Sequence, residues 1–263
     1  MTVAIVVPTY NERENLPLLV GKIREVLESH SLDGYIIIVD DSSPDGTGRV
    51  AEALRVQDRR IQVIHRPCRQ GVATAYVAGF RRALALGAEY VFQMDADLSH
   101  DPRYIPAFLG KIAVHDLVLG TRYAHGGGAE DWSRWRWLIS KGGNIYTRTI
   151  LGLPFSDLTG GYKCYRRRVL ERLDWESITA WGFAFQIETT YRVWKMGFQI
   201  GEVPIVFCER LSGRSKMSGR IFLEAMVVVW RLRFADLPRS PQDERSRSLP
   251  SAGNHEECIQ CRL

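Results

Sequence analysis

The sequence predicts an α/β protein built on a doubly wound, mostly parallel sheet with helices on both faces. Three observations lead to this prediction. Short runs rich in Val and Ile alternate along the chain with longer segments whose apolar residues recur at helical spacing. The first two runs, residues 3–7 and 35–39, are apolar throughout, which is typical of strands buried on both faces. Acidic residues follow the first, second and fourth runs, where a parallel sheet binds its ligands.

The first part of the chain is expected to alternate strands and helices in order. The predicted strands span residues 3–7, 35–39, 61–64 and 90–92, and the predicted helices between them span residues 15–28, 48–56 and 73–86. Asn15 can cap the first helix, and Pro17 fits its first turn. Leucine, valine and isoleucine then recur three and four residues apart, so one face of this helix is expected to pack on the sheet.

The second part departs from strict alternation. We expect a strand at residues 116–119, a helix at about 138–151 that starts in or near the tryptophan-rich segment 132–137, a turn into a strand at 156–163, a helix from about 181 to 196, a bent strand or strand pair around Pro204, and a closing amphipathic helix at 221–236. One domain is predicted over residues 1–237, with a nucleotide-binding half at 1–115 and an acceptor half at 116–237. Residues 238–263 are rich in Pro, Ser, Arg and Glu, so a disordered tail is predicted.

Charge and composition restrict the partners and the compartment. The chain has 263 residues, a net charge of +5 and a pI of about 9.0, which suits anionic partners. It carries no DNA- or RNA-reading signature, so a nucleic-acid partner is not expected. The five cysteines are odd in number and scattered, which favours a reducing, cytoplasmic compartment. No stretch reaches the about 18 apolar residues of a membrane-spanning helix, so none is expected.

Two carboxylates, Asp95 and Asp97, follow the predicted strand at residues 90–92. Residues two apart on a strand point to one face, so both side chains can converge on one ion. Mg²⁺ and Mn²⁺ prefer such oxygen ligands, usually one or two carboxylates plus substrate phosphates. The alternative is a pair of turn aspartates ahead of Pro102. The other acidic loops favour a nucleotide site, and the chain lacks the glycine-rich loops of kinase and hydride-transfer chemistry.

Tryptophan and arginine are interleaved between Trp132 and Trp137. This segment has two interpretations. It can form a corner of the core, or it can form an amphipathic patch at a membrane interface, because Trp and Arg both favour the headgroup region. The pattern favours neither interpretation.

A set of motifs in a fixed order gives the chain a resemblance to a known family. The motifs occupy residues 7–12, 40–47, 95–100, 120–123, 157–163, 185–188 and 201–205, together with Ser140, Asn144, Arg210 and Lys216. The set resembles the family-2 glycosyltransferases of the GT-A fold, and its later motifs are similar to those of the polyprenol-phosphate mannosyltransferases, the dolichol-phosphate mannose synthase group. The resemblance covers residues 3 to about 234. The chain departs from it at Ala73, where the family often has a second glycine, which alters the loop that approaches the donor.

The resemblance implies transfer of mannose from GDP-mannose to a polyprenyl (dolichyl) monophosphate, with inversion of the anomeric centre. It implies Mg²⁺ or Mn²⁺ on Asp95 and Asp97, with close backbone approach at Met94 and Ala96. The guanosine end of the donor is assigned to Pro8, Tyr10, Glu12, Val39 and Asp41. The phosphates of the donor or of the acceptor are assigned to Arg122, Arg210 and Lys216, with Arg136 as a further ligand of the acceptor phosphate.

The residues suit a phosphate acceptor for a physical reason. A phosphate monoester is already anionic near pH 7, so it needs placement and charge compensation rather than a strong general base. Arginine forks match phosphate oxygens, and no histidine base is evident. The lipid acceptor, the basic clusters and the amphipathic closing helix also imply a peripheral place on the cytoplasmic face of a membrane, where a separate membrane-anchoring subunit is a further candidate partner.

Other interpretations of the same residues stay open. A UDP-sugar such as UDP-glucose is the alternative donor, and a non-catalytic subunit that docks on a membrane or a nucleic acid is the alternative class of protein. Arg122 and Arg136 have the alternative of surface ion pairs. Glu188 has the alternative of a helix cap or ion pair, while His100 is expected to be a hydrogen-bonding loop residue and Gln186 a structural one.

Overall fold

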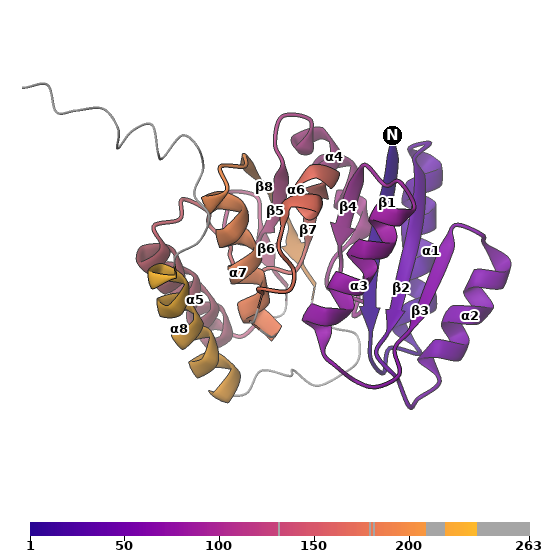
Figure 1. Cartoon of the computed structure of the whole chain (residues 1–263), viewed down its shortest axis with the longest axis horizontal. Coiled ribbons are helices and arrows are strands. Elements are labelled where there is room, and N and C mark those ends of the chain that lie inside the picture. The colour runs from indigo at the N-terminus through magenta and orange to yellow at the C-terminus, as the bar shows by residue number, and fades with distance from the viewer. Residues whose placement is uncertain (131, 179, 181, 209–218, 236–263) are drawn as a thin grey trace, which may run out of the picture.

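The computed structural model describes residues 1–130, 132–178, 180, 182–208 and 219–235. Its centre is a seven-stranded sheet (Figure 1). The strands, in spatial order, are β3 (Ile61–His65), β2 (Asp33–Asp40), β1 (Thr2–Thr9), β4 (Tyr90–Gln93), β7 (Lys163–Arg166), β5 (Leu117–Thr121) and β8 (Ile200–Pro204). β7 runs antiparallel to both of its neighbours, and every other neighbouring pair is parallel. The predicted mostly parallel sheet is therefore confirmed.

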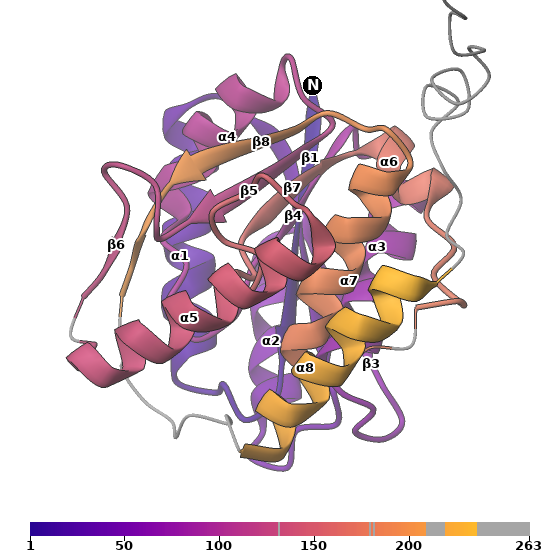
Figure 2. The same ribbon diagram turned by 90° about the vertical axis from the view of Figure 1, so that its left-hand side faces the viewer.

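Helices cover both faces of this sheet. They are α1 (Asn15–Ser29), α2 (Thr47–Gln57), α3 (Val72–Ala85), α4 (Ile105–Ile112), α5 (Arg134–Leu151), α6 (Arg167–Arg172), α7 (Gly182–Lys195) and α8 (Gly219–Phe234). On one face, α1, α2 and α4 pack around a core that includes Leu16 and Phe108. On the other face, the remaining helices pack around a core that includes Tyr76, Phe80 and Phe185. Figure 2 shows α5 and α8 side by side in the outer layer, next to α7.

α5 begins at Arg134, within the tryptophan-rich segment, as expected, because the Ser133 hydroxyl accepts a hydrogen bond from the Arg136 N–H (3.3 Å) and caps the helix. The structure corrects the predicted elements in two other places. Asn15 does not cap α1; it lies inside the helix, and its amide donates to the Glu12 carboxylate (2.8 Å). The short helices α4 and α6 and the single turn η1 (Pro102–Tyr104) were not predicted, because all three are shorter than the about 10 residues by which a helix is told from other apolar segments.

A small second sheet lies within residues 116–237, the predicted acceptor half. β6 (Gly128–Ala129) pairs in parallel with β9 (Val206–Phe207). Because β8 ends at Pro204 and β9 follows it, the strand pair predicted around this proline is present. The predicted disordered tail lies outside the described residues. None of the helices that the structure describes is long and apolar enough to cross a membrane.

Candidate active site

The loops that follow β1, β2 and β4 meet at one edge of the sheet, because these three strands are parallel neighbours. The first two loops bind each other directly. The Thr9 hydroxyl donates to the Asp40 carboxylate (3.2 Å), and the Glu12 N–H donates to the Thr47 hydroxyl (3.0 Å). The acidic strand ends that the sequence predicted therefore lie together.

Asp41 is buried and holds the loop that follows β3 through hydrogen bonds and an ion pair. Its carboxylate accepts hydrogen bonds from the N–H groups of Gln70 and Gly71, the latter at 2.8 Å. It also pairs with Arg66 Nη1 at 2.8 Å. A guanosine contact at Asp41 would thus be made by a carboxylate whose orientation the β3–α3 loop fixes.

The other residues assigned to the guanosine end differ in their access to a ligand. Pro8, Tyr10 and Glu12 are partly exposed. The guanidinium carbon of Arg69, on the β3–α3 loop, lies 4.0 Å from the centroid of the Tyr10 ring. Val39 is fully buried and its side chain lies in the core, so any contact that it makes to a ligand would use its backbone.

Asp95 and Asp97 follow β4, and each is held by hydrogen bonds. The Tyr76 hydroxyl donates to Asp95 Oδ1 (2.6 Å), and the Asp95 N–H donates to His100 Nδ1 (3.0 Å). The Asp95 side chain nevertheless stays 36% exposed. Asp97 is buried, and its Oδ1 accepts from both the N–H and the hydroxyl of Ser99. Met94 and Ala96, on either side of Asp95, are buried in the core.

The two carboxylates fit Mg²⁺ or Mn²⁺ as hard oxygen donors. Within the described part of the chain, no group of three or more His, Cys, Asp or Glu side chains comes together to hold a metal ion. One or two carboxylates completed by substrate phosphates are the usual ligand set of Mg²⁺ at such sites. These residues therefore fit an ion that is shared with a bound diphosphate.

Arg122 follows β5 and is buried. Its Nε and Nη2 atoms donate to the two carboxylate oxygens of Asp157 (2.7 and 2.8 Å), and Nη2 also donates to the Thr159 hydroxyl (2.8 Å). Burial alone would raise the pKa of Asp157, but the Arg122 guanidinium beside it holds that pKa below its ordinary value. The alternative of a surface ion pair is wrong for Arg122, since this pair lies inside the protein.

Helix α5 is tied to this buried pair. Asn144 accepts a hydrogen bond from the Leu158 N–H (2.7 Å) and donates to the Thr159 hydroxyl (3.1 Å). The Tyr123 hydroxyl donates to Ser140 on the same helix (2.7 Å). Motif residues from three separate segments of the acceptor half thus form one polar cluster around Arg122.

Trp132 brings Arg122 and Arg136 near one another. The centroid of its ring lies 5.3 Å from the guanidinium carbon of Arg122 and 4.4 Å from that of Arg136. Trp135 and Trp137 are exposed, at 74% and 38%. Trp132 is half-buried and packs on Phe207 (5.5 Å between ring centroids), while the other two tryptophans have the exposure that the interfacial interpretation requires. Arg210 and Lys216 lie outside the described residues.

Gln186 accepts a hydrogen bond from the Gln93 amide (2.7 Å), and Glu188 pairs with Arg192 (2.6 Å), in agreement with their structural interpretations. Two other contacts at this site have no signal in the sequence. Tyr76 was not predicted as a site residue, because its partner Asp95 lies 19 positions away and on another element. The pairing of Arg122 with Asp157 spans 35 positions and was missed for the same reason.

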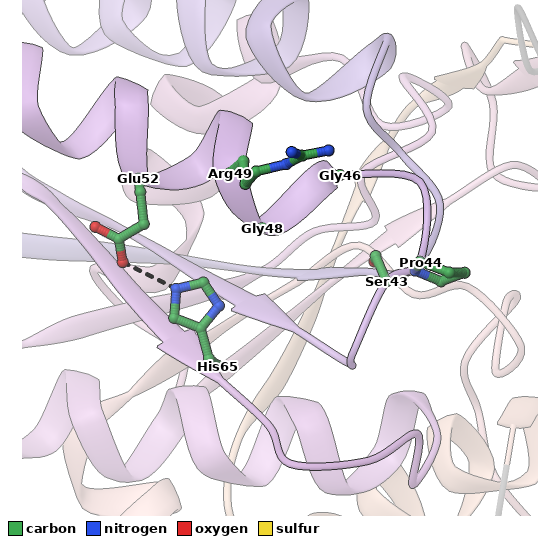
Figure 3. Close-up of a pocket in the computed structure, with 7 residues that line it drawn as sticks. All are labelled: Ser43, Pro44, Gly46, Gly48, Arg49, Glu52 and His65. Carbon is green, nitrogen blue, oxygen red and sulfur yellow. Dashed lines mark hydrogen bonds and ion pairs between the residues drawn. The ribbon is translucent and has the colours of Figure 1, made fainter.

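A hollow of about 610 Å³ lies next to the acidic edge, between the loop after β2 and helix α2 (Figure 3). Its lining residues are Ser43, Pro44, Gly46, Gly48, Arg49, Glu52 and His65. Figure 3 shows the Glu52 carboxylate facing the His65 ring, to which it is bonded at 2.9 Å. Neither Asp95 nor Asp97 lines this hollow, so it neighbours the candidate site and is not its metal-binding part.

Comparison with known proteins places the chain among glycosyltransferases. The family model for glycosyl transferase family 2 matches residues 4–174. The undecaprenyl-phosphate mannosyltransferase of Micrococcus luteus is 42% identical over 231 residues, which cover 88% of this chain and 93% of that protein. The polyprenol monophosphomannose synthase of Mycolicibacterium smegmatis is 43% identical over 233 residues, covering 87% of this chain and 86% of that protein.

Solved structures share the fold. Glucosyl-3-phosphoglycerate synthase from Mycobacterium tuberculosis, in complex with Mn²⁺ and UDP-glucose, superposes with a TM-score of 0.62 at 19% identity, covering 88% of this chain and 78% of that one. The same enzyme with Mn²⁺, UDP and phosphoglyceric acid gives a TM-score of 0.63 at 17% identity, covering 91% and 80%. At such identities the likeness concerns the fold alone, and this is the GT-A fold that the sequence motifs implied.

Proposed function

The chain belongs to glycosyltransferase family 2 and is a glycosyltransferase, and from this premise we propose that it transfers mannose from GDP-mannose to a polyprenyl monophosphate with inversion of the anomeric carbon. Two relatives that are named for mannosyl transfer to polyprenyl phosphates, and that match over most of their own length, support the sugar and the acceptor. The observation that carries the proposal is the acidic edge, where Asp95 and Asp97 follow β4.

The donor end of the site belongs to the loops at this edge. Tyr10, Glu12 and Asp41 would hold the nucleoside, and Asp95 and Asp97 would hold Mg²⁺ or Mn²⁺ on the diphosphate. When bound, the ion offsets the negative charge of the departing diphosphate. Neighbours solved with Mn²⁺ support a divalent ion, and the carboxylates suit either metal.

The acceptor end belongs to the arginines. Among the described residues, the Nη1 group of Arg122 has no protein hydrogen bond, whereas Nε and Nη2 are held by Asp157. We propose that Nη1 donates to a phosphate oxygen, because the buried pair fixes the direction of the guanidinium fork. Arg136 shares the Trp132 ring with Arg122 and would bind the acceptor phosphate with it, as would Arg210, while Lys216 would bind donor phosphate.

The face formed by α5 and α8 suits a lipid surface. Its exposed large apolar side chains are Trp135, Trp137, Leu138, Ile139 and Ile145 on α5, with Val227, Trp230 and Phe234 on α8. The two helices are neighbours (Figure 2), joined where the Tyr146 hydroxyl donates to the Met226 carbonyl (3.4 Å). Basic residues accompany these apolar ones on both helices, including Arg134 and Arg231. We propose peripheral association with the cytoplasmic face of a membrane.

A donor competition assay tests the activity. Purified protein, Mn²⁺ and a short polyprenyl phosphate are mixed with radiolabelled GDP-mannose or UDP-glucose, with Asp97→Ala as the control. Lipid-linked label from GDP-mannose alone, lost in the control, is expected. Label from UDP-glucose alone would keep the fold and the site but replace the donor. No transfer from either sugar in the presence of lipid would leave a binding subunit as the function.

A vesicle flotation assay tests the membrane face. The double variant Trp135→Ser/Trp230→Ser is expected to bind anionic vesicles at least about tenfold more weakly than the wild type, since two buried indoles contribute more than about 2 kcal/mol. Val56→Ser is the matched control, because Val56 is equally apolar and 81% exposed but lies on α2. If the wild-type protein did not bind vesicles, the result would favour a separate membrane-anchoring subunit that binds this face.

A further inference from the structure

Tyr76 is a fully buried residue of α3 whose hydroxyl reaches the candidate active site. Its ring lies in the core, parallel to the Phe185 ring (1° between planes, 6.3 Å between centroids) and stacked near Phe80 at 5.9 Å. Its hydroxyl oxygen is 2.6 Å from Asp95 Oδ1. A buried tyrosine needs a partner for its hydroxyl, and here that partner is a carboxylate of the acidic edge.

The hydrogen bond fixes the conformation of Asp95 from two sides. A hydroxyl that donates to a carboxylate makes one of the stronger hydrogen bonds in proteins. The Asp95 backbone N–H is held separately by His100 Nδ1 at 3.0 Å, and the His100 ring is itself buried and stacked on Tyr162. With its backbone and Oδ1 both held, Asp95 retains a side chain that is 36% exposed, and its other oxygen, Oδ2, lies 4.0 Å from His100 Nε2.

We infer that Tyr76 is a positioning residue for the donor site: its hydroxyl holds Asp95 in the one conformation in which Oδ2 is presented to the metal-bound diphosphate. This inference rests on the proposed function, since it needs Asp95 to meet a divalent ion. A carboxylate that is already oriented loses less conformational freedom when it binds an ion. Residues that orient metal ligands in this way typically affect metal affinity or activity by about 10- to 100-fold.

A purely structural role for Tyr76 is separable from this one. The ring fills the core through its contacts with Phe80 and Phe185, and phenylalanine would preserve those contacts. Only the hydroxyl reaches Asp95. Tyr165 is a matched control, because it is also fully buried and edge-on to Phe80, but its hydroxyl donates to the Gln93 amide oxygen (3.2 Å) and not to a carboxylate.

The experiment measures Mn²⁺ binding in the presence of GDP, from the electron paramagnetic resonance signal of free Mn²⁺. Tyr76→Phe is expected to weaken binding by about 10- to 100-fold, whereas Tyr165→Phe is expected to stay within about twofold of the wild type. Thermal melting of all three proteins reports on the fold. Equal Mn²⁺ binding in Tyr76→Phe and the wild type would overturn the inference, and so would an equal loss in both tyrosine variants.

A double-mutant cycle with Asp95→Asn tests whether Tyr76 acts through Asp95. The Tyr76→Phe effect on Mn²⁺ binding is expected to vanish in the Asp95→Asn background, and an undiminished effect there would contradict the inference.

Phe185→Leu tests the contribution of ring packing, because it keeps the Tyr76 hydroxyl and loosens the contact with the Tyr76 ring. A smaller loss of Mn²⁺ binding than in Tyr76→Phe is expected, and an equal loss would make packing the cause. A wild type that binds no Mn²⁺ with GDP present would instead contradict the metal site of the proposed function.

Discussion

The two halves of the molecule hold their charged residues in different ways. In the predicted nucleotide-binding half, the carboxylates lie on loops at strand ends, where hydroxyl and backbone N–H groups hold them, as Tyr76 holds Asp95 and Gly71 holds Asp41. In the acceptor half, the central charge is Arg122, which is buried and paired with Asp157 inside a cluster that also includes Asn144 of α5. The first arrangement depends on strand ends, whereas the second depends on tertiary packing.

Because of this difference, substitutions at the carboxylates after β4 should affect activity without affecting stability, whereas substitutions in the Arg122 cluster should affect both. A loop carboxylate such as Asp95, still 36% exposed, can lose its charge without leaving an opposite charge buried. Removing a partner from the Arg122 cluster leaves a charge or an N–H group without compensation in the interior, which is costly. Variants of the carboxylates that follow β4 should therefore lose activity alone, and variants of the Arg122 cluster should lose both activity and stability.

Asp97→Asn should have the largest effect on activity and little effect on stability. The amide removes a charge from the ion on the diphosphate but keeps an oxygen that can accept from Ser99. We expect kcat/KM to fall on the order of 10³-fold, as when one group that stabilises transition-state charge is removed. Urea unfolding should stay close to the wild type. A variant with near-normal transfer would exclude Asp97 from the metal site.

Asp157→Ala should have the largest effect on stability. It leaves the Arg122 guanidinium buried without its partner, so the free energy of unfolding should fall by about 3–5 kcal/mol in urea titrations. The double variant Arg122→Met/Asp157→Leu removes both charges and should recover most of that loss, while transfer to the acceptor stays low. If the double variant were as unstable as the single one, an uncompensated charge would not be the cause.

The sequence predicts the nucleotide-binding half well because its signals are local. Each strand there is a short β-branched run, and each acidic loop follows its own strand directly, so order along the chain decides position in space. The prediction that Asp95 and Asp97 share an edge with Asp41 needed only the parallel arrangement of the strands.

The acceptor half is less predictable because its contacts join distant segments. β7 lies antiparallel between β4 and β5, and the pattern of apolar residues along the sequence does not predict such a pairing. A sequence motif predicted a functional role for Arg122 but did not indicate that this residue is buried against Asp157. Tyr76 could not be predicted for the same reason. Its apolar neighbours in the sequence indicate a core residue, and only the fold brings its hydroxyl to Asp95.

Asn144→Ala should have an intermediate effect that distinguishes the ends of the site. The change removes the acceptor of the Leu158 N–H and the donor to Thr159, and a buried N–H left without a partner costs about 1–3 kcal/mol. KM for the polyprenyl phosphate should rise more than KM for the nucleotide sugar, because the loop that carries Asp157, the partner of Arg122, loses its tie to α5. Thr149→Ala is the control, since that exposed hydroxyl bonds only within α5. Equal changes in both KM values would argue against a separate acceptor half.

Lys163→Met should have the smallest effect on activity, and its effect on stability should be visible as a change in pH dependence. Lys163 is fully buried, and its ammonium donates to the Gln186 carbonyl (2.8 Å) and to the hydroxyls of Thr189 and Thr190. Burial lowers the pKa of Lys163 from 10.5 to about 7. Between these values the unfolded chain binds a proton that the folded protein does not, so stability should rise with pH from about 7 to about 10.5.

The titration of Lys163 gives the free energy of unfolding a measurable slope against pH. Lys163 should contribute at most about 1.4 kcal/mol per pH unit to the free energy of unfolding above pH 7, and nothing to the slope below it, where both states are protonated. Urea titrations of the wild type and of Lys163→Met at pH 7.5, 8.5 and 9.5 should show the extra slope in the wild type alone. Parallel curves would mean that the three oxygens around the ammonium keep Lys163 charged, and that a positive charge can lie buried in the acceptor half without a carboxylate partner.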